Sequence, residues 1–298
     1  MMEVTHHPLK GATWMLSAGL AFALINTLTQ VLSIHMGMNS TSVAFIQYAI
    51  ALIVFIPWVY KTGIKATLST SYPSLHVLRV VLAVVGIQLW IWALAYPIPI
   101  WQGIALLMTS PLMATLGAGL FLKEQVGLYR WLATLVGFCG AMLILEPWSE
   151  SFNWAALLPL GAAFFWASYS LMVKRLSRDD TSSTMVMYLL LLMTPFNALL
   201  TFSDFTQPAS LNTWLFLVCI GLLTAFAQWA IARAYAVADA AFVQPWDHLK
   251  LPVNVLAGYL VFGWMPPGRL WLGAAMIILA VAFITHWENR EQQVAVKV

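Results

Sequence analysis

The chain has 298 residues, of which 61% are hydrophobic and only 8% are charged, and its formal net charge is +3. Charged residues make up about a quarter of an ordinary soluble domain, so this composition excludes that class and indicates a polytopic membrane protein. The basic residues are spread over polar connections and form no basic patch, which argues against nucleic acid as a ligand.

Ten apolar stretches follow one another along the chain, each close to the roughly 20 residues that a helix needs to cross a bilayer. We expect membrane-spanning helices at 12–34, 42–60, 76–96, 99–121, 128–146, 154–175, 184–203, 211–234, 239–263 and 268–287. The N-terminus lacks a small-residue cleavage site, so the first span is expected to be retained and not removed as a signal peptide. The sequence therefore predicts an all-α integral membrane fold.

The distribution of Lys and Arg predicts how these spans are oriented. With the N-terminus in the cytoplasm, only Arg269 falls on the outer side. The cytoplasmic connections and ends then carry Lys10, Lys61, Lys65, Arg79, Lys123, Arg130, Lys174, Arg175, Arg178, Arg233, Arg290 and Lys297. Because cytoplasmic connections of membrane proteins are enriched in Lys and Arg, both termini are expected in the cytoplasm.

An internal repeat divides the chain into two halves. Residues 130–145 align without gaps with residues 270–285, and the alignment extends upstream with a small slip that pairs Pro111 with Pro252. Five spans in each half is an odd number, so the halves, 1–149 and 150–298, should enter the membrane from opposite sides. Such inverted repeats are typical of secondary transporters, with the substrate site at the interface of the halves.

The chain resembles the EamA-type branch of the drug/metabolite transporter superfamily over nearly all ten spans. The resemblance rests on Arg79 opening the third span, on "ALAY" at its end, and on Ser110-Pro111 in the fourth. It rests also on "LKEQ" after the fourth span, and on "RAYAVADAAFVQP" and "LPVNVLAGYLVFG" in the second half. Trp264 departs from the pattern, because the family usually has a Glu there. The resemblance implies transport of a small metabolite across a bacterial inner membrane.

The ninth span contains the most unusual polar segment, "QPWDHLKLP", which runs from Gln244 to Pro252. Asp247 and Lys250 are three residues apart and share a helix face, with Gln244 and Asn254 close to the same stripe. His248 and Trp246 lie at its edges. A lone charge near the bilayer centre costs about 3 kcal/mol, so intramembrane charges are paired or functional.

Three interpretations of this segment stay open. Asp247 and Lys250 form a structural ion pair, or they bind opposite ends of a polar or zwitterionic substrate. In the third, Asp247 or His248 carries a coupling proton. Lys250 also lies near enough to the helix end for its ammonium group to reach the membrane interface.

Polar side chains in the other spans are further candidates for a central cavity. They are Asn26, Gln30, Gln47, Gln88, Gln102, Thr109, Ser110, Trp166, Ser168, Tyr169, Ser170, Asn197 and Gln228. Each could instead form a hydrogen bond between helices, since a buried amide needs a partner in either case. Arg233 is a candidate for an anionic substrate group or for a gate with Asp239 or Glu124, whereas Arg79 is interpreted as a topology signal.

These features together predict a secondary transporter that moves a small polar or zwitterionic metabolite by alternating access. Export is the direction expected from the resemblance, and proton coupling is an additional expectation. No phosphate-binding glycine loop, no HExxH and no GxSxG occurs, so ATP-driven pumping and an intramembrane enzyme are disfavoured. A passive channel remains the main alternative. We expect no cofactor and no metal, and a monomer or homodimer in the bacterial inner membrane.

Overall fold

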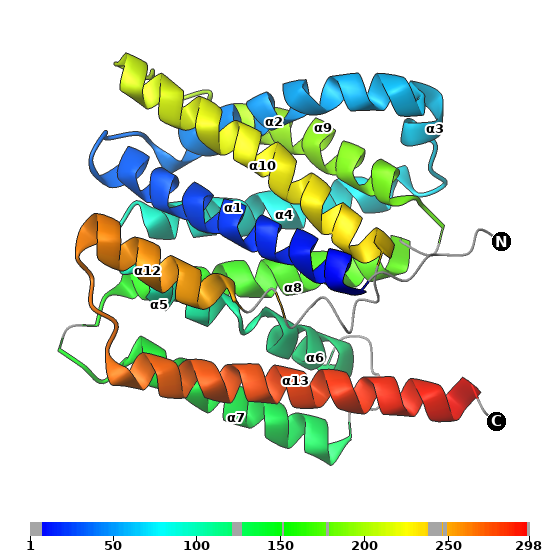
Figure 1. Ribbon diagram of the computed structural model, residues 1–298, viewed down its shortest axis with the longest axis vertical. Helices are drawn as coiled ribbons and strands as arrows, with labels where there is room; N and C mark the ends of the chain where they lie inside the picture. The colour runs from blue at the N-terminus through cyan, green and yellow to red at the C-terminus, as the bar shows by residue number, and fades with distance from the viewer. Residues whose placement is uncertain are drawn as a thin grey trace.

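A computed structural model of the chain describes residues 8–120, 127–150, 152–176, 179–237, 246 and 249–296. Every regular element in these ranges is a helix, and the long helices lie side by side in one bundle (Figure 1). The helices are α1 (Pro8–Ile34), α2 (Ser40–Thr62), α3 (Ile64–Leu68), α4 (Pro73–Leu94), α5 (Ile100–Leu107), α6 (Ser110–Leu120), α7 (Leu128–Leu145), η1 (Trp154–Leu157), α8 (Leu158–Leu176), α9 (Ser182–Thr201), α10 (Leu211–Val237), α12 (Lys250–Phe262) and α13 (Gly268–Val296).

The described helices agree with the predicted spans. Nine stretches of the described chain are long and apolar enough to cross a membrane, and they correspond to the first eight predicted spans and the tenth. The ninth span is represented by the shorter apolar helix α12. The all-helical membrane fold expected from the composition is confirmed.

The fourth span is interrupted near its middle. α5 ends at Leu107 and α6 begins at Ser110, and the Thr109 hydroxyl donates a hydrogen bond of 2.7 Å to the Leu106 carbonyl at the break. Pro111 follows in the first turn of α6, where its missing N–H is tolerated. Pro252 also lies in the first turn of its helix, α12, so both prolines are near the start of a helix that begins inside a predicted span.

Four pairs of helices make the most extensive contacts, namely α1 with α10, α7 with α13, α4 with α8, and α2 with α9. The α7–α13 pair is antiparallel and packs backbone to backbone (Figure 1). A Cβ atom built on Gly140 would lie 2.6 Å from the Gly273 carbonyl oxygen, and one on Gly273 would lie equally near the Gly140 oxygen. Only glycines permit this approach, which is the usual role of small residues between membrane helices.

α1 begins and α13 ends on the same side of the bundle (Figure 1). We call this side the terminal face. The connections between α2 and α4 and between α8 and α9 also lie there, because the helices alternate in direction. The other side, with the connections around residues 35–39, 95–99, 202–210 and 263–267, is called the opposite face.

Candidate functional site

A chain of hydrogen bonds joins three helices in the interior of the bundle. The Trp90 indole N–H in α4 donates to the Asn26 amide oxygen in α1 over 3.1 Å. The Asn26 amide nitrogen donates to the Asn254 oxygen in α12 over 3.2 Å, and Asn254 donates to the Lys250 carbonyl over 2.7 Å. All three side chains are buried, so each polar group has its partner within the protein.

Two indole rings lie beside this chain of hydrogen bonds. The Trp90 and Trp166 ring centroids are 6.4 Å apart, with a tilt of 47° between the planes. A Cβ atom on Gly86 would lie 2.8 Å from the Trp166 indole, so the glycine makes room for that ring. We call Asn26, Trp90, Trp166 and Asn254 the central cluster. It combines aromatic surfaces with amide groups, which suits a flat ligand that has polar edges.

Other predicted cavity residues form hydrogen bonds between helices or connections. The donor and acceptor pairs are Gln47 Nε2 to Thr224 Oγ1 (2.8 Å), Gln88 Nε2 to Asn197 Oδ1 (2.6 Å), Gln30 Nε2 to the Ile98 carbonyl (2.9 Å) and Gln102 Nε2 to the Ile144 carbonyl (3.2 Å). These four glutamines therefore form contacts within the bundle, which is one of the two roles expected for them from the sequence. They join helices and connections of the bundle to one another.

The remaining candidates lie in several places. Thr109 and Ser110 are at the break in the fourth span, and Gln228 is partly buried in α10. The exposed Arg233 guanidinium lies 5.9 Å from the centroid of the Trp229 ring. Lys250 begins α12, and Trp246 packs against α1 and α10 near the terminal face. Gln244, Asp247, His248, Asp239 and Glu124 lie outside the described residues, so the interpretations of these side chains stay predictions.

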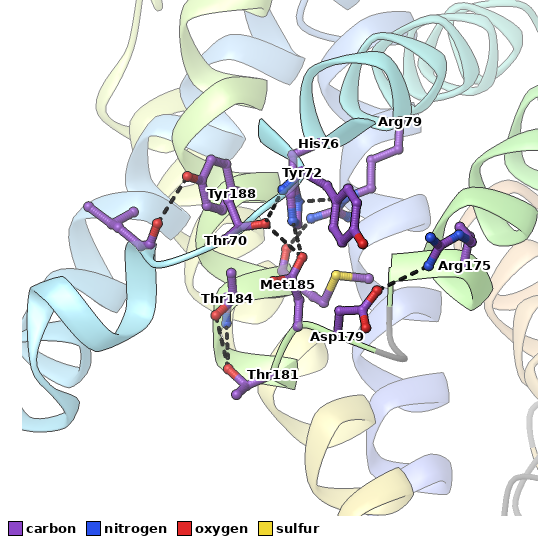
Figure 2. A network of polar contacts seen from close by, with 12 residues as sticks. Thr70, Tyr72, His76, Arg79, Arg175, Asp179, Thr181, Thr184, Met185 and Tyr188 are labelled. Atoms are coloured by element: carbon purple, nitrogen blue, oxygen red, sulfur yellow. Dashed lines mark hydrogen bonds and ion pairs between the residues drawn. The ribbon is translucent and has the colours of Figure 1, made fainter. Parts of the chain in front are cut away.

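A second polar network lies at the terminal face, and the sequence analysis did not predict it (Figure 2). The His76 Nε2 atom lies 2.8 Å from a carboxylate oxygen of Asp180, and the Thr70 hydroxyl donates to the same oxygen over 2.9 Å. The Arg79 Nε–H donates to His76 Nδ1 over 3.0 Å. We call Thr70, His76, Arg79, Tyr169 and Asp180 the terminal clasp, because they join α4 to α8 and to the connection before α9.

Arg79 is fully buried in the clasp and is more than a topology signal. Its Nη1 group donates to the Tyr169 hydroxyl over 3.2 Å, and its Nη2 group donates to the Met185 carbonyl over 2.6 Å. A buried guanidinium is tolerated only when its donors are satisfied, and here all three of its nitrogens have acceptors. Arg79 thereby ties α4 to both α8 and α9.

Aromatic side chains and a surface ion pair border the clasp. The Tyr188 ring stacks on the His76 imidazole with centroids 4.3 Å apart, and its hydroxyl donates to the Leu68 carbonyl over 3.1 Å. Arg175 pairs with Asp179 over 3.1 Å at the surface. The Arg175 guanidinium donates a hydrogen bond to that carboxylate, which raises the pKa of Arg175.

The opposite face carries a different set of polar contacts. The Asn39 amide donates to the Asp204 carboxylate over 2.8 Å, and Glu146 forms an ion pair with Arg269. A cavity of about 270 Å³ opens on this side, and its lining includes Gln102, Glu146 and Arg269. The two faces therefore differ in chemistry, since the described histidine–arginine contact belongs to the terminal face.

A bundle of apolar membrane-length helices, with polar groups joined across its interior, defines the class of polytopic membrane transporters. Residues 9–146 and 153–286 both match the EamA-like transporter family, so the chain belongs to that family. The resemblance noted in the sequence is thereby confirmed.

Individual relatives are similar along nearly the whole chain. A riboflavin transporter of Vibrio cholerae is 65% identical over 98% of both chains. A riboflavin transporter of Rhizobium johnstonii is 49% identical over 95% of this chain and 93% of that one. An S-adenosylmethionine uptake transporter of Rickettsia bellii is 28% identical over 92% of this chain and 95% of its own length.

A solved structure, described only as the crystal structure of a protein, shares the fold with a TM-score of 0.58 and 18% identity. It covers 90% of this chain and 97% of its own. The relatives are named transporters, which confirms that this chain is a transporter and not an enzyme. The chain is a multi-pass protein of the bacterial inner membrane that moves a small molecule.

Proposed function

We propose that this chain carries riboflavin across the inner membrane. The observation that supports this most is the 65% identity, over 98% of both chains, with the riboflavin transporter of Vibrio cholerae. The relative from Rhizobium johnstonii, which is also a riboflavin transporter, supports it as well. Riboflavin is neutral and polar, so the proposal keeps the polar substrate expected from the sequence and replaces the zwitterionic one.

The chemistry of the central cluster is compatible with this substrate. Riboflavin has a flat three-ring system with an imide edge, and a flexible side chain that bears hydroxyl groups. Trp90 and Trp166 offer aromatic faces for stacking, and the amides of Asn26 and Asn254 offer donors and acceptors that suit the imide. We propose that the ring system binds here and replaces part of the hydrogen bonding between these side chains.

We further propose that the two halves are an inverted repeat that works by alternating access. In such a repeat α4 corresponds to α10, α8 to α1, and α9 to α2. The helix contacts agree with this correspondence, because α4 packs on α8 as α10 packs on α1, and α4 packs on α9 as α10 packs on α2. The contacting pairs α2–α9 and α7–α13 each combine one helix with its counterpart in the other half, so exchange of the halves leaves each pair unchanged. A carrier built in this way exposes one midplane site to each side in turn. We place the terminal face in the cytoplasm, in line with the Lys and Arg distribution.

Net transport in this proposal follows the gradients that act on the carrier, so the same protein supports uptake and release. Asp247, His248 and Lys250 stay proposed substrate contacts, because they precede or begin the helix that carries Asn254. A continuous passive channel remains the alternative, and it differs from a carrier in showing no exchange of substrate across the membrane.

Riboflavin binding to the purified protein tests the proposed site. Replacing Trp166 with Leu removes a stacking surface, and stacking on one aromatic ring contributes about 1–3 kcal/mol, so affinity should fall about 5- to 150-fold. Trp92→Leu is the matched control, because Trp92 lies in α4 but is 48% exposed on the outer surface of the bundle. Quenching of riboflavin fluorescence measures both. Equal affinity of the Trp166→Leu and wild-type proteins would contradict the site, and no binding to the wild type would contradict the substrate.

A further inference from the structure

The hydrogen bonds of the terminal clasp determine the protonation state of His76. Arg79 can only donate, because a guanidinium carries no acceptor. Its Nε–H points at His76 Nδ1 over 3.0 Å, so Nδ1 must hold a free lone pair. The single ring proton is then on Nε2, which lies 2.8 Å from the Asp180 carboxylate and donates to it. His76 is therefore neutral in this arrangement.

A second proton on His76 is incompatible with this packing. It would have to bind Nδ1, where its N–H would face the N–H of Arg79, and two positive groups would then be in contact in a buried place. The His76 side chain is 0% exposed and that of Asp180 is 4% exposed, so little solvent screens the repulsion. Either Arg79 leaves its acceptors on α8 and α9, or the protonated His76 moves outward with Asp180.

We propose that His76 is a proton-binding site of the transporter, and that proton binding there opens the packing of α4 against α8 and α9 at the terminal face. The inference rests on the proposed transport function for its physiological meaning. By linkage, a proton that binds only the open clasp shifts the clasp toward opening, and closing the clasp expels the proton.

Groups with opposite effects on proton binding face His76. Arg79 on α4 opposes the proton, whereas Asp180 before α9 favours it. Tyr188 on α9 covers the imidazole ring, and Tyr169 on α8 reaches the site only through Arg79. The Arg175–Asp179 pair lies at the surface and is joined to Tyr72. Imidazole is the side chain that ordinarily changes its charge between about pH 5 and pH 8.

The opposite face has no described equivalent of this contact. Its polar contacts include Asn39 with Asp204 and Glu146 with Arg269, and His35 there stacks on Phe262 with ring centroids 5.8 Å apart. Since the described part of that face shows no histidine bonded to arginine, we expect proton binding to open the terminal face selectively. In such a transporter, proton binding is coupled to the opening of one face and not to the opening of the other.

Hydrogen–deuterium exchange of the protein in lipid nanodiscs tests the site without any substrate. At about pH 6, exchange in the first turns of α4, after correction for the intrinsic rate, should be at least about threefold faster than at about pH 8. Binding of one proton changes the opening equilibrium by at most about tenfold per pH unit, and this is the upper limit for the change in exchange rate. In His76→Gln the amide keeps one donor and one acceptor but binds no proton, so the difference should disappear.

Two further variants complete the test. His286→Gln removes an exposed histidine of α13 outside the clasp and should keep the wild-type pH response. If His76→Gln yields no folded protein, Arg79→Gln serves in its place: it removes the charge that opposes the proton, and the pH response should again be lost. A wild-type protein with equal exchange at both pH values, or a variant of the clasp that keeps the full response, would overturn the proposal. Failure to bind riboflavin would overturn the proposed function alone.

Discussion

Asn254 is the residue on which the central cluster depends most. It is fully buried, it accepts a hydrogen bond from Asn26 in α1, and it donates to the first residue of its own helix. Since Asn26 in turn accepts from Trp90, the amide of Asn254 fixes the orientation of an indole in α4 through one intermediate. A substrate that displaces these contacts would act on three helices at once.

Replacement of either asparagine should destabilise the protein because it leaves a buried partner unpaired. Asn254→Leu is expected to cost about 1–3 kcal/mol, which is the penalty for one orphaned buried polar group. The double variant Asn26→Leu and Asn254→Leu should cost less than the sum of the two single variants, because no amide is then left without its partner. Thermal unfolding in nanodiscs measures all three proteins. Additive effects would show that the two amides are not coupled.

At this scale the sequence predicted which residues are polar and buried but not their partners. Asn26, Gln88 and Gln102 stand out because each is an amide in an apolar span; Asn26 is buried, and Gln88 and Gln102 are partly buried with hydrogen-bond partners on other segments. The partners lie on other spans, and spacing along one helix contains no information about them. His76 is not among the residues predicted from the sequence. Its place three residues before Arg79, on one helix face, is the signal that could have identified it.

The helices themselves could be predicted well, since hydropathy and length determine membrane spans almost without regard to tertiary contacts. The break between α5 and α6 is the main departure. Its signal is Ser110-Pro111, because a proline lacks the N–H that would bond to the carbonyl four residues earlier and is therefore favoured in the first turn of a helix over its interior. Hydropathy alone predicts one continuous span from 99 to 121, because the residues on both sides of this proline are apolar. The interruption puts Thr109 at a helix end in the bundle interior, which is typical of transporter sites.

The α7–α13 pair offers a prediction about one element. Gly140→Val would put a side chain against the backbone of α13, since even a Cβ atom would lie 2.6 Å from the Gly273 oxygen. Overpacking of this kind costs about 1–3 kcal/mol or more, so the unfolding temperature should fall clearly. Gly127→Ala is the control, because nothing lies within 4 Å of a Cβ atom there. A Gly140→Val protein as stable as the control would show that the two helices are not packed this closely.

For the whole molecule, the described polar contacts differ between the two faces of the bundle. The terminal face is held by a buried arginine and histidine, and the opposite face by an amide–carboxylate contact and a half-exposed ion pair. In the proposed inverted repeat the scaffold of paired helices is shared between the halves, whereas these polar contacts are not. An alternating-access carrier needs two gates that open at different times, and a chemical difference between the gates allows one of them to respond to protons.

Counterflow in proteoliposomes tests the central claim most directly. Vesicles that contain the protein are loaded with unlabelled riboflavin and diluted into a trace of labelled riboflavin. Unlabelled riboflavin that leaves through a carrier brings the binding site back to the outside, where the site then binds labelled riboflavin. Labelled riboflavin should therefore accumulate transiently inside above its outside concentration. S-adenosylmethionine loaded in place of riboflavin should not drive this accumulation. Entry of label that is unaffected by internal riboflavin would indicate a channel, and no entry at all would contradict riboflavin as the substrate.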